Sequence, residues 1–351
     1  MKTKIQKVNP EEFGDSELQE ACSILQKGGL VAFPTETVYG LGGDALRKEA
    51  ARKIYEAKGR PSDNPLIVHV ADMDSLYDVA ENVPVQAEKL AEAFWPGPLT
   101  MIFSKKNKVP YSTTGGLDTV AVRMPGHPVA LALIRESGVY IAAPSANTSG
   151  RPSPTKAEHV AEDLDGRIDM ILDGGTVGIG LESTIVDMST EVPTILRPGY
   201  ITEEMLKEAI GEVQIDPAIV GKTMKKNIKA KAPGMKYRHY APKGQMTIVE
   251  GEMQKVITAI NDMVQEKRAL GCRVAVIATE ETKECYHCDL VRSIGSRKSE
   301  GSIAAGLYDI LREMDHLEAE FIFAESFEQD RLGKAIMNRM LKAAAYHLIQ
   351  V

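Results

Sequence analysis

Short apolar runs alternate with stretches of helical periodicity along the first 210 residues. Apolar runs bounded by Gly, Pro or polar residues predict strands, and apolar positions that recur at helical spacing predict helices. The expected strands are residues 30–33, 66–70, 99–103, 119–123, 140–143, 170–172, 183–187 and 194–196. The expected helices are residues 17–27, 50–57, 86–94, 128–137, 156–163 and 203–210. This alternation predicts an α/β domain over residues 1–210, in which helices cover a twisted sheet of parallel or mixed strands.

A second, smaller pattern of the same kind runs over residues 245–351. Its expected strands are residues 246–249, 273–278 and 321–324, and its expected helices are residues 253–267, 302–314 and 334–349. The alternation predicts a Rossmann-like α/β domain. Because no G-x-G-x-x-G follows its first strand, dinucleotide binding is not expected there.

Residues 211–244 connect the two patterns and have an unusual charge distribution. No acidic residue occurs from position 217 to 249, whereas eight lysines and arginines do. Such a run is either a solvated linker or a segment that meets an anion. Residues 233–242 hold two tyrosines, a histidine and two cations between prolines, which is unlike a flexible Gly/Ser spacer and indicates a segment that docks on a surface.

The composition, with 43% apolar and 26% charged residues, is typical of a globular protein. No apolar run approaches the roughly 18 residues that cross a bilayer, and no apolar signal core follows the basic start. A cytoplasmic location is therefore expected. The net charge of −7 argues against a protein that simply coats nucleic acid.

Four cysteines are too few for a disulfide framework in a chain of 351 residues. The pair Cys285 and Cys288 flanks a histidine and invites a zinc interpretation, but Cys272 is a poor fourth ligand because it precedes an expected buried strand. We therefore favour reduced thiols near a loop and expect no metal site built by the protein alone.

Polar residues and glycines gather just beyond the expected strand ends of the first domain. In open α/β sheets, ligands bind at the carboxyl ends of strands, so these segments are expected to converge. They are residues 33–45, 58–65, 119–128, 142–153 and 178–199. Four cations stand at element ends within them, namely Lys58, Arg60, Arg123 and Arg197. Such a set suits a nucleoside triphosphate together with a carboxylate.

Each segment also has a simpler explanation when taken alone. The glycine-rich residues 33–45 can form a tight turn, and His69 inside an apolar strand can be a buried core residue. Glu36 either orients a neighbouring cation or caps the turn. The chain has no P-loop and no G-x-S-x-G, so Ser145 is not expected to act as a nucleophile.

Taken together, the motifs resemble those of the YrdC/Sua5 family in order and spacing. They are F-P-T-E-T-V-Y-G-L at 33–41, K-G-R-P at 58–61 with N-P-L at 64–66, W-P-G-P-L-T at 95–100, R-M-P at 123–125, P-S-A-N at 144–147, and S-T at 183–184 with L-R-P-G at 196–199. The linker sequence P-G-M-K-Y-R-H-Y-A-P at 233–242, followed by a small α/β domain, resembles the two-domain Sua5 branch. The resemblance thus covers nearly the whole chain.

The resemblance implies a threonylcarbamoyl-AMP synthase. Such an enzyme converts L-threonine, bicarbonate and ATP, with Mg²⁺ accompanying the ATP, to L-threonylcarbamoyl-AMP and pyrophosphate. A separate complex then transfers the threonylcarbamoyl group to adenosine 37 of tRNA, giving t6A, so this chain would hand over its product and bind tRNA at most weakly. The acid-free linker is expected to close over the phosphates as a lid and to shield the labile product from water.

The resemblance also assigns residues to the two substrates. The threonine side would be lined by Thr37, His69, Arg123, the Ala143 backbone and Ser183. ATP would be held by Arg60, Asn64, Thr119, Ser145, Ser153, Arg197 and either Tyr237 or Tyr240. Lys58 and Arg60 would be the catalytic cations near the phosphates. This chemistry needs oriented anions and stabilised phosphoryl charge more than a nucleophile, which agrees with the lack of a catalytic triad.

Two other functions remain as alternatives. A concave basic surface would also suit a double-stranded RNA-binding or ribosome-assembly module, which would bind RNA in a salt-sensitive manner and release no pyrophosphate. A carbamoyltransferase like the related domains of hydrogenase-maturation proteins is the second alternative. Those domains usually occur in longer chains with acylphosphatase-like and zinc-finger modules, which this chain lacks.

Overall fold

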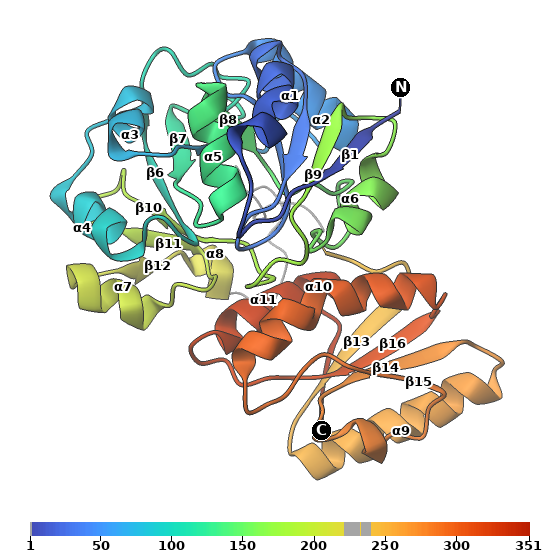
Figure 1. Cartoon of the computed structure of the whole chain (residues 1–351). Helices are drawn as coiled ribbons and strands as arrows, with labels where there is room; N and C mark the ends of the chain where they lie inside the picture. Colours follow the sequence, from blue (N-terminus) through green and yellow to red (C-terminus); the bar gives the residue numbers. More distant parts are fainter. Residues whose placement is uncertain (1, 221–231, 233–239) are drawn as a thin grey trace.

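The structure, a computed structural model, describes residues 2–220, 232 and 240–351 (Figure 1). A mixed sheet of twelve strands forms the first domain in the described part of the chain. Its strands are β1 (Lys4–Lys7), β2 (Val31–Phe33), β3 (Gly40–Asp44), β4 (Ile67–His69), β5 (Ala80–Glu81), β6 (Leu99–Lys105), β7 (Thr119–Arg123), β8 (Ile141–Ala143), β9 (Met170–Asp173), β10 (Thr184–Asp187), β11 (Thr194–Arg197) and β12 (Gln214–Ile215). They follow the order β1-β9-β2-β3-β8-β4-β7-β6-β10-β11-β12, with β5 beside β6. The expected α/β fold with a twisted sheet is confirmed, and all eight expected strands of this domain are present.

Helices cover this sheet, as expected. They are α1 (Asp15–Gln26), α2 (Lys48–Lys58), α3 (Met73–Val79), α4 (Val85–Phe94), α5 (Pro128–Ser137), α6 (Ala157–Leu164), α7 (Glu203–Ile210) and the short α8 (Pro217–Val220). Helix α1 packs against α5, and both bury an apolar face against β2, β8 and β9. Their apolar faces form one cluster with these strands, and a larger cluster includes residues of α2, α4, β6 and β7.

The glycines of the 33–45 segment have a structural role that the sequence did not indicate. Gly40 to Asp44 form strand β3, which pairs antiparallel with β2 and β8. A Cβ atom at Gly42 would lie 2.7 Å from Ile141 Cγ2 and 2.9 Å from Phe33 Cε1. The tight turn considered for this segment is therefore wrong beyond Tyr39, because the glycines let three strands pack closely.

The C-terminal domain is a five-stranded parallel sheet in the order β15-β14-β16-β13-β17. The strands are β13 (Gln245–Glu250), β14 (Val274–Ala278), β15 (Leu290–Ser293), β16 (Phe321–Glu325) and β17 (Leu348–Gln350). The helices are α9 (Met253–Ala269), α10 (Glu300–His316) and α11 (Gly333–Ala343), with a 3₁₀ turn η1 (Lys283–Cys285). The Rossmann-like alternation is confirmed, but the helix expected over 334–349 is wrong at its end. It stops at Ala343, and the last residues add strand β17 to the sheet edge because their backbone pairs with β13.

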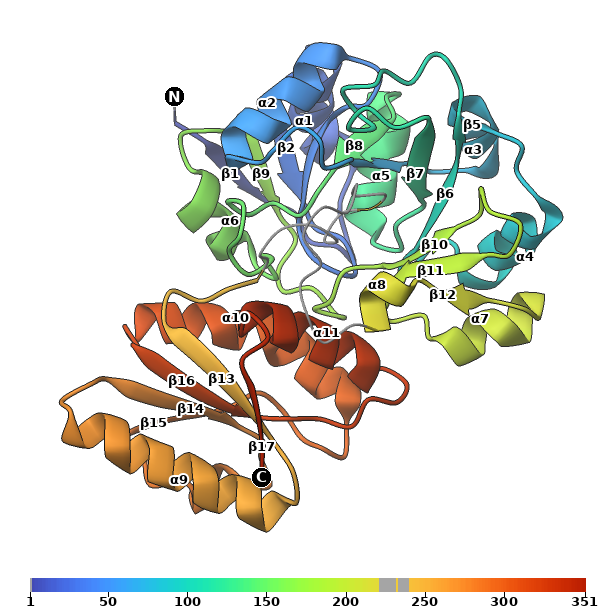
Figure 2. The same cartoon turned by 180° about the vertical axis from the view of Figure 1, so that it is seen from behind.

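The two domains pack closely on each other. Helices α10 and α11 lie between the small sheet and the first domain, whereas α9 covers the opposite face (Figures 1 and 2). Val38 and Leu181 of the first domain join the apolar cluster of Leu307 and Tyr308 on α10. A Cβ atom at Gly180, where φ is +78°, would lie 2.5 Å from the Cα of Ala305, so this glycine permits a close approach of the domains.

The beginning of the expected linker belongs structurally with the first domain. Strand β12 pairs in parallel with β11, and α8 follows it. Most of the expected lid, including Tyr237, lies outside the described residues. The boundaries at 210 and 245 and the lid stay predictions.

Candidate active site

A pocket opens where the strand ends and loops of the first domain converge with Tyr240. Its lining residues are Thr35, Thr37, Val38, Tyr39, Gly40, Lys58, Arg60, Ile67, His69, Arg123, Ala143, Pro144, Ser145, Asn147, Ser149, Gly150, Arg151, Ser153, Glu182, Ser183, Arg197 and Tyr240. They include five lysine and arginine side chains and one carboxylate. All five expected segments contribute, so the predicted convergence of these loops is observed.

Parallel pairing of β4 and β7 brings two of the expected residues together. His69 and Arg123 are register partners at the carboxyl ends of these strands. Both side chains are buried. Burial strongly disfavours the imidazolium form of His69, and the positive charge of Arg123 acts in the same direction, so its pKa falls to about 3. His69 is therefore neutral across the physiological pH range.

Arg123 is held in place by three groups of the first domain. Its Nη2 donates to Glu36 Oε1 at 2.7 Å, its Nη1 to Thr37 Oγ1 at 3.0 Å, and its Nε to the Gly97 carbonyl at 3.2 Å. Glu36 thus orients a neighbouring cation, the first of its two expected roles. A guanidinium carries five N–H donors, so Arg123 keeps capacity for an anion in the pocket.

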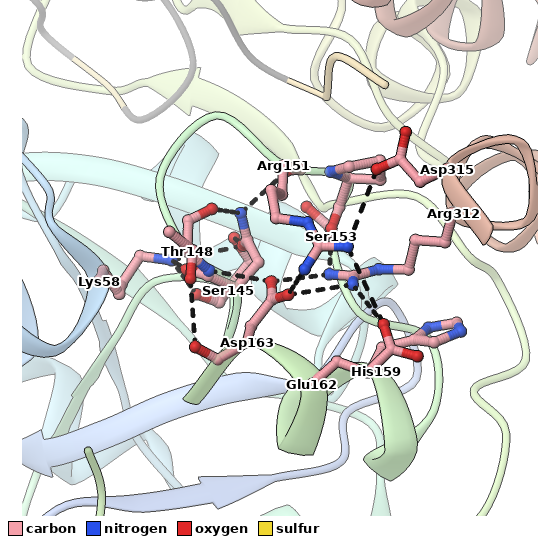
Figure 3. A network of polar contacts seen from close by, with 12 residues as sticks. Lys58, Ser145, Thr148, Arg151, Ser153, His159, Glu162, Asp163, Arg312 and Asp315 are labelled. Atoms are coloured by element: carbon pink, nitrogen blue, oxygen red, sulfur yellow. Dashed lines mark hydrogen bonds and ion pairs between the residues drawn. The ribbon is translucent and has the colours of Figure 1, made fainter. Parts of the chain in front are cut away.

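Lys58 is buried and its ammonium binds the loop that follows β8 (Figure 3). Its Nζ donates to the Ser145 carbonyl at 2.6 Å, and to the carbonyl and side-chain oxygens of Asn147. Burial and the nearby Arg60 hold the pKa of Lys58 well below its usual value. Lys58 lines the pocket, and its three contacts indicate that it fixes the loop carrying Ser145. Its expected place near the phosphates stays a prediction. Asn147 was not singled out by the sequence, although it stands in the P-S-A-N motif.

Arg197, at the end of β11, connects two faces of the pocket. Its Nε donates to the Ser183 carbonyl at 3.0 Å and its Nη2 to Ser183 Oγ at 3.1 Å. Ser183 Oγ also lies 2.7 Å from Thr100 Oγ1. An expected threonine-side residue and an expected ATP-side residue are therefore in direct contact.

Glu182 is the one carboxylate among the described lining residues, and the sequence analysis did not select it. It accepts hydrogen bonds from Ser153 Oγ at 2.6 Å, Tyr308 OH at 2.7 Å and Arg339 Nε at 3.1 Å. Burial alone would raise its pKa, but the charges of Arg339 and Arg197 outweigh this effect and lower the pKa to about 2. Its place directly before the S-T motif was the only sequence signal, whereas Tyr308 and Arg339 are far away in the chain.

Some expected ATP contacts lie beside the pocket or outside the described residues. Asn64 is buried near the pocket residue Arg60, and its Oδ1 has no hydrogen-bond partner among the described residues. Thr119 stands at the start of β7, away from the lining. Tyr240 lines the pocket and stacks on Tyr308 with ring centroids 5.1 Å apart. Tyr237 belongs to the residues that are not described.

The described residues contain no group of three or more His, Cys, Asp or Glu side chains that could hold a metal ion. Cys288 Sγ donates to the Val274 carbonyl at 3.2 Å, and Cys272 packs against the same apolar cluster as Cys288. Among the helices in the described part, none is long and apolar enough to cross a membrane.

The arrangement can bind an elongated anionic ligand. Buried cations and hydroxyls line the recess, and a buried charge acts more strongly than one on the surface. The pocket offers no acid–base dyad and no activated nucleophile among its described residues. Its chemistry is therefore orientation and charge stabilisation.

Two family models cover most of the chain. The Sua5/YciO/YrdC model, described as telomere recombination, matches residues 23–199. The model described as the C-terminal domain of threonylcarbamoyl-AMP synthase matches residues 201–345.

Relatives of known name agree over the full length. The chain is 50% identical to the threonylcarbamoyl-AMP synthase of Bacillus subtilis, covering 96% of this chain and 95% of that protein. It is 48% identical to the enzyme of the same name from Pyrococcus abyssi, covering 97% and 98%. The crystal structure of P. abyssi Sua5 complexed with L-threonine superposes with a TM-score of 0.94 at 47% identity, covering 99% of this chain and all of that one. The chain therefore belongs to the Sua5/YciO/YrdC family and contains both the domain that gives the family its name and the Sua5 C-terminal domain.

Proposed function

We propose that this chain is a threonylcarbamoyl-AMP synthase, which makes L-threonylcarbamoyl-AMP and pyrophosphate from ATP, L-threonine and bicarbonate. Relatives that are 48–50% identical over nearly the whole chain carry this name, and one related structure holds L-threonine. The observation that carries the proposal is the convergence of Arg123, His69, Arg60 and Arg197 in one pocket. The chain is thus an enzyme that transfers AMP.

The threonine half of the pocket centres on Arg123. Three protein contacts do not use all of the N–H groups of this guanidinium. We assign the substrate carboxylate to the remaining N–H groups, because a buried cation at a strand end is well suited to a carboxylate. Thr37, Ser183 and the Ala143 backbone supply polar groups around it. An imidazole with a pKa of about 3 is a weak base, so we assign His69 to binding rather than to proton removal.

The ATP half lies on the other side of Ser183. We assign the triphosphate to Arg60 and Arg197, with Lys58 nearby, and the remaining contacts to Ser145, Ser153 and Tyr240, all of which line the pocket. Asn64 does not line the pocket and is assigned to ATP by resemblance. Thr119 and Tyr237 remain assigned by resemblance alone.

Mg²⁺ enters this proposal as a partner of ATP. The one carboxylate among the described lining residues, Glu182, is already engaged by Arg339, Ser153 and Tyr308. The protein residues therefore do not fit a dedicated Mg²⁺ site, and the phosphates and water would supply the ligands.

The reaction follows from this placement. The neutral amine of threonine becomes a carbamate when it adds to the carbon of bicarbonate, with loss of water, or to carbon dioxide, with loss of one proton. A carbamate oxygen then forms a bond to the α-phosphorus of ATP while the bond to pyrophosphate breaks. Arg60 and Arg197 stabilise the phosphoryl charge, and the fixed carboxylate keeps the carbamate in line.

The RNA-binding alternative is not favoured by the position of the cations. Lys58, Arg123 and Arg197 are 1–5% exposed, so the phosphates of a nucleic-acid duplex cannot reach them. A small ligand that enters the pocket can. We further propose that the product passes to a tRNA-modifying complex, because a mixed carbamic–phosphoric anhydride is labile in water, and that this chain itself binds tRNA at most weakly.

Pyrophosphate release from ATP tests the function. The full-length protein is assayed with each of the twenty amino acids, with and without bicarbonate. We expect release only when threonine and bicarbonate are both present. Release with ATP alone, or equally with other amino acids, would contradict the synthase assignment.

A further inference from the structure

Two arginines of the C-terminal domain cross the domain interface and end beside the pocket loops. Arg312 on α10 and Arg339 on α11 are only 1% and 0% exposed. Arginine is rarely buried to this degree unless its charge is paired. Arg312 pairs with Asp163 of the first domain, and Arg339 pairs with Glu182.

Arg312 holds the loop that carries Ser153 (Figure 3). Its Nη2 donates to the Pro152 carbonyl at 2.7 Å and to Asp163 Oδ2 at 2.9 Å, and its Nη1 donates to Asp163 Oδ1 at 3.2 Å. Asp163 also accepts the backbone N–H of Thr148 at 3.0 Å. The guanidinium therefore fixes the loop after β8 at two points, one of them directly before Ser153.

Arg339 acts in the same way on the neighbouring loop. Its Nη1 donates to the Pro198 carbonyl at 2.7 Å, directly after Arg197, and its Nε donates to Glu182 at 3.1 Å. Glu182 in turn accepts the hydroxyl of Ser153. Each C-terminal arginine thus binds a backbone carbonyl next to a residue that we assign to ATP.

Within the threonine half, Arg123 and His69 have no comparable dependence among the described residues, whereas Ser183 binds Arg197 and stands next to Glu182. Arg123 is held by Glu36, Thr37 and Gly97, all of the first domain. His69 binds the carbonyl of Ile67 within its own strand.

We propose that the C-terminal domain positions the ATP half of the pocket through Arg312 and Arg339, while Arg123 and His69 of the threonine half are held by first-domain groups. The inference rests on the proposed function. Without Arg339, only Arg197 remains to balance the negative charge of Glu182. Glu182 then neutralises more of the positive charge of Arg197, which weakens its attraction for the triphosphate. Without Arg312, Asp163 loses its bidentate partner and the Ser153 loop loses a fixed point. Both arginines are positioning residues, since neither lines the pocket.

Steady-state kinetics and threonine binding in the full-length protein test this role. Arg339→Met and Arg312→Met keep much of the side-chain volume and remove the charge. We expect the ATP KM to rise at least about tenfold and kcat to fall, because Asp163 is then left to Arg151 and Glu182 to Arg197, and both of these arginines line the pocket. The threonine Kd, measured by calorimetry without ATP, should stay within about twofold of the wild-type value, because the contacts that orient Arg123 all lie within the first domain.

Lys334→Met is the matched control. Lys334 lies on the same helix as Arg339 and forms an ion pair across the same interface, with Glu203 at 3.2 Å, but touches no pocket loop. Its ATP KM should be that of the wild type. An ATP KM that rises as much in this variant as in Arg339→Met would show a general loss of domain contact and overturn the positioning role.

Further variants distinguish positioning from folding. If Arg339→Met unfolds, a double variant replaces it. Glu182→Gln/Arg339→Met removes both buried charges, and its ATP KM should be higher than that of Glu182→Gln alone. Arg339→Lys, which keeps the charge, should recover part of the ATP affinity. An unchanged ATP KM, or equal losses of ATP and threonine affinity, overturns the inference. A wild-type protein that releases no pyrophosphate contradicts the proposed function instead, and direct ATP binding then replaces the KM in the same comparison.

Discussion

The guanidinium of Arg123 illustrates how a single residue obtains its function from its neighbours. Glu36, Thr37 and the Gly97 carbonyl fix three sides of the group, so it is already oriented before a ligand arrives. Preorganisation of this kind lowers the cost of binding, because the side chain loses little further freedom. The partly buried Glu36 also balances part of the charge of Arg123.

Substitution of Arg123 by Ala should therefore raise the threonine KM far more than the ATP KM. Loss of a charge-assisted contact to a carboxylate corresponds to about 1.5–3 kcal/mol, or a tenfold to hundredfold change. Glu36→Gln keeps the shape and removes only the charge, so it should give a smaller change in the same direction. Separate titrations of threonine and ATP in the pyrophosphate assay measure both values. Equal effects of Arg123→Ala on the two substrates would contradict the assignment of Arg123 to threonine.

Strand β3, next to the site, packs between its neighbouring strands because three of its residues are glycines without side chains. Gly42 lies between β2 and β8, where Phe33 and Ile141 leave no room for a Cβ atom. The strand continues from the Thr35–Tyr39 segment and bridges to Ser145 through Gly40. The packing of β3 thereby connects the threonine side and the loop after β8.

Gly42→Ala should destabilise the first domain by about 1–3 kcal/mol, because the added methyl group overpacks a closed space. Activity should fall as well, since β3 shifts relative to β8. Gly178→Ala is the matched control, because no atom lies within 4 Å of its Cβ position, and its stability should change by less than about 0.5 kcal/mol. Urea unfolding of the three proteins measures the free energies. Equal stability of the Gly42 variant and the wild type would contradict the packing role of β3.

The same strand marks the limit of what the sequence predicts about elements. Apolar runs such as 66–70 and 119–123 are buried in the core, and this burial is visible in the sequence as a run of apolar residues, which predicts a strand. Strand β3 is mostly glycine and lacks the run of apolar residues that predicts a strand. The residues of β17 continue the helical periodicity of α11, so their sequence predicts a longer helix instead of a strand. In both cases pairing with neighbouring strands decides the structure, and this partner is not visible in a local pattern.

At the scale of the whole molecule, the sequence predicted two domains but not how they act on one another. The pocket residues of the first domain are recognisable because they stand in compact motifs at strand ends. Arg312 and Arg339 lie on the ordinary amphipathic helices α10 and α11, and nothing in their local sequence separates them from exposed arginines. Their role follows only from the contact between domains, which buries them against Asp163 and Glu182.

This interface should also make the two domains unfold together. The chain has one tryptophan, Trp95, buried in the first domain with its Nε1 donating to the Leu99 carbonyl. Its fluorescence therefore reports the first domain alone, whereas far-UV circular dichroism reports both. In the wild type, the two signals should give the same urea midpoint.

In Arg312→Met/Arg339→Met the two midpoints should separate. A buried carboxylate left without any cation costs about 3–5 kcal/mol. Each loss here is smaller, because Asp163 keeps Arg151 and Glu182 keeps Arg197, but both losses fall on the interface rather than on either core. The domain of lower intrinsic stability then unfolds at a lower urea concentration than its neighbour. Lys334→Met, which loses only a partly exposed pair, should keep coincident transitions. Coincident midpoints in the double variant would mean that the apolar contacts around Val38 and Leu181, and not the buried arginines, couple the domains.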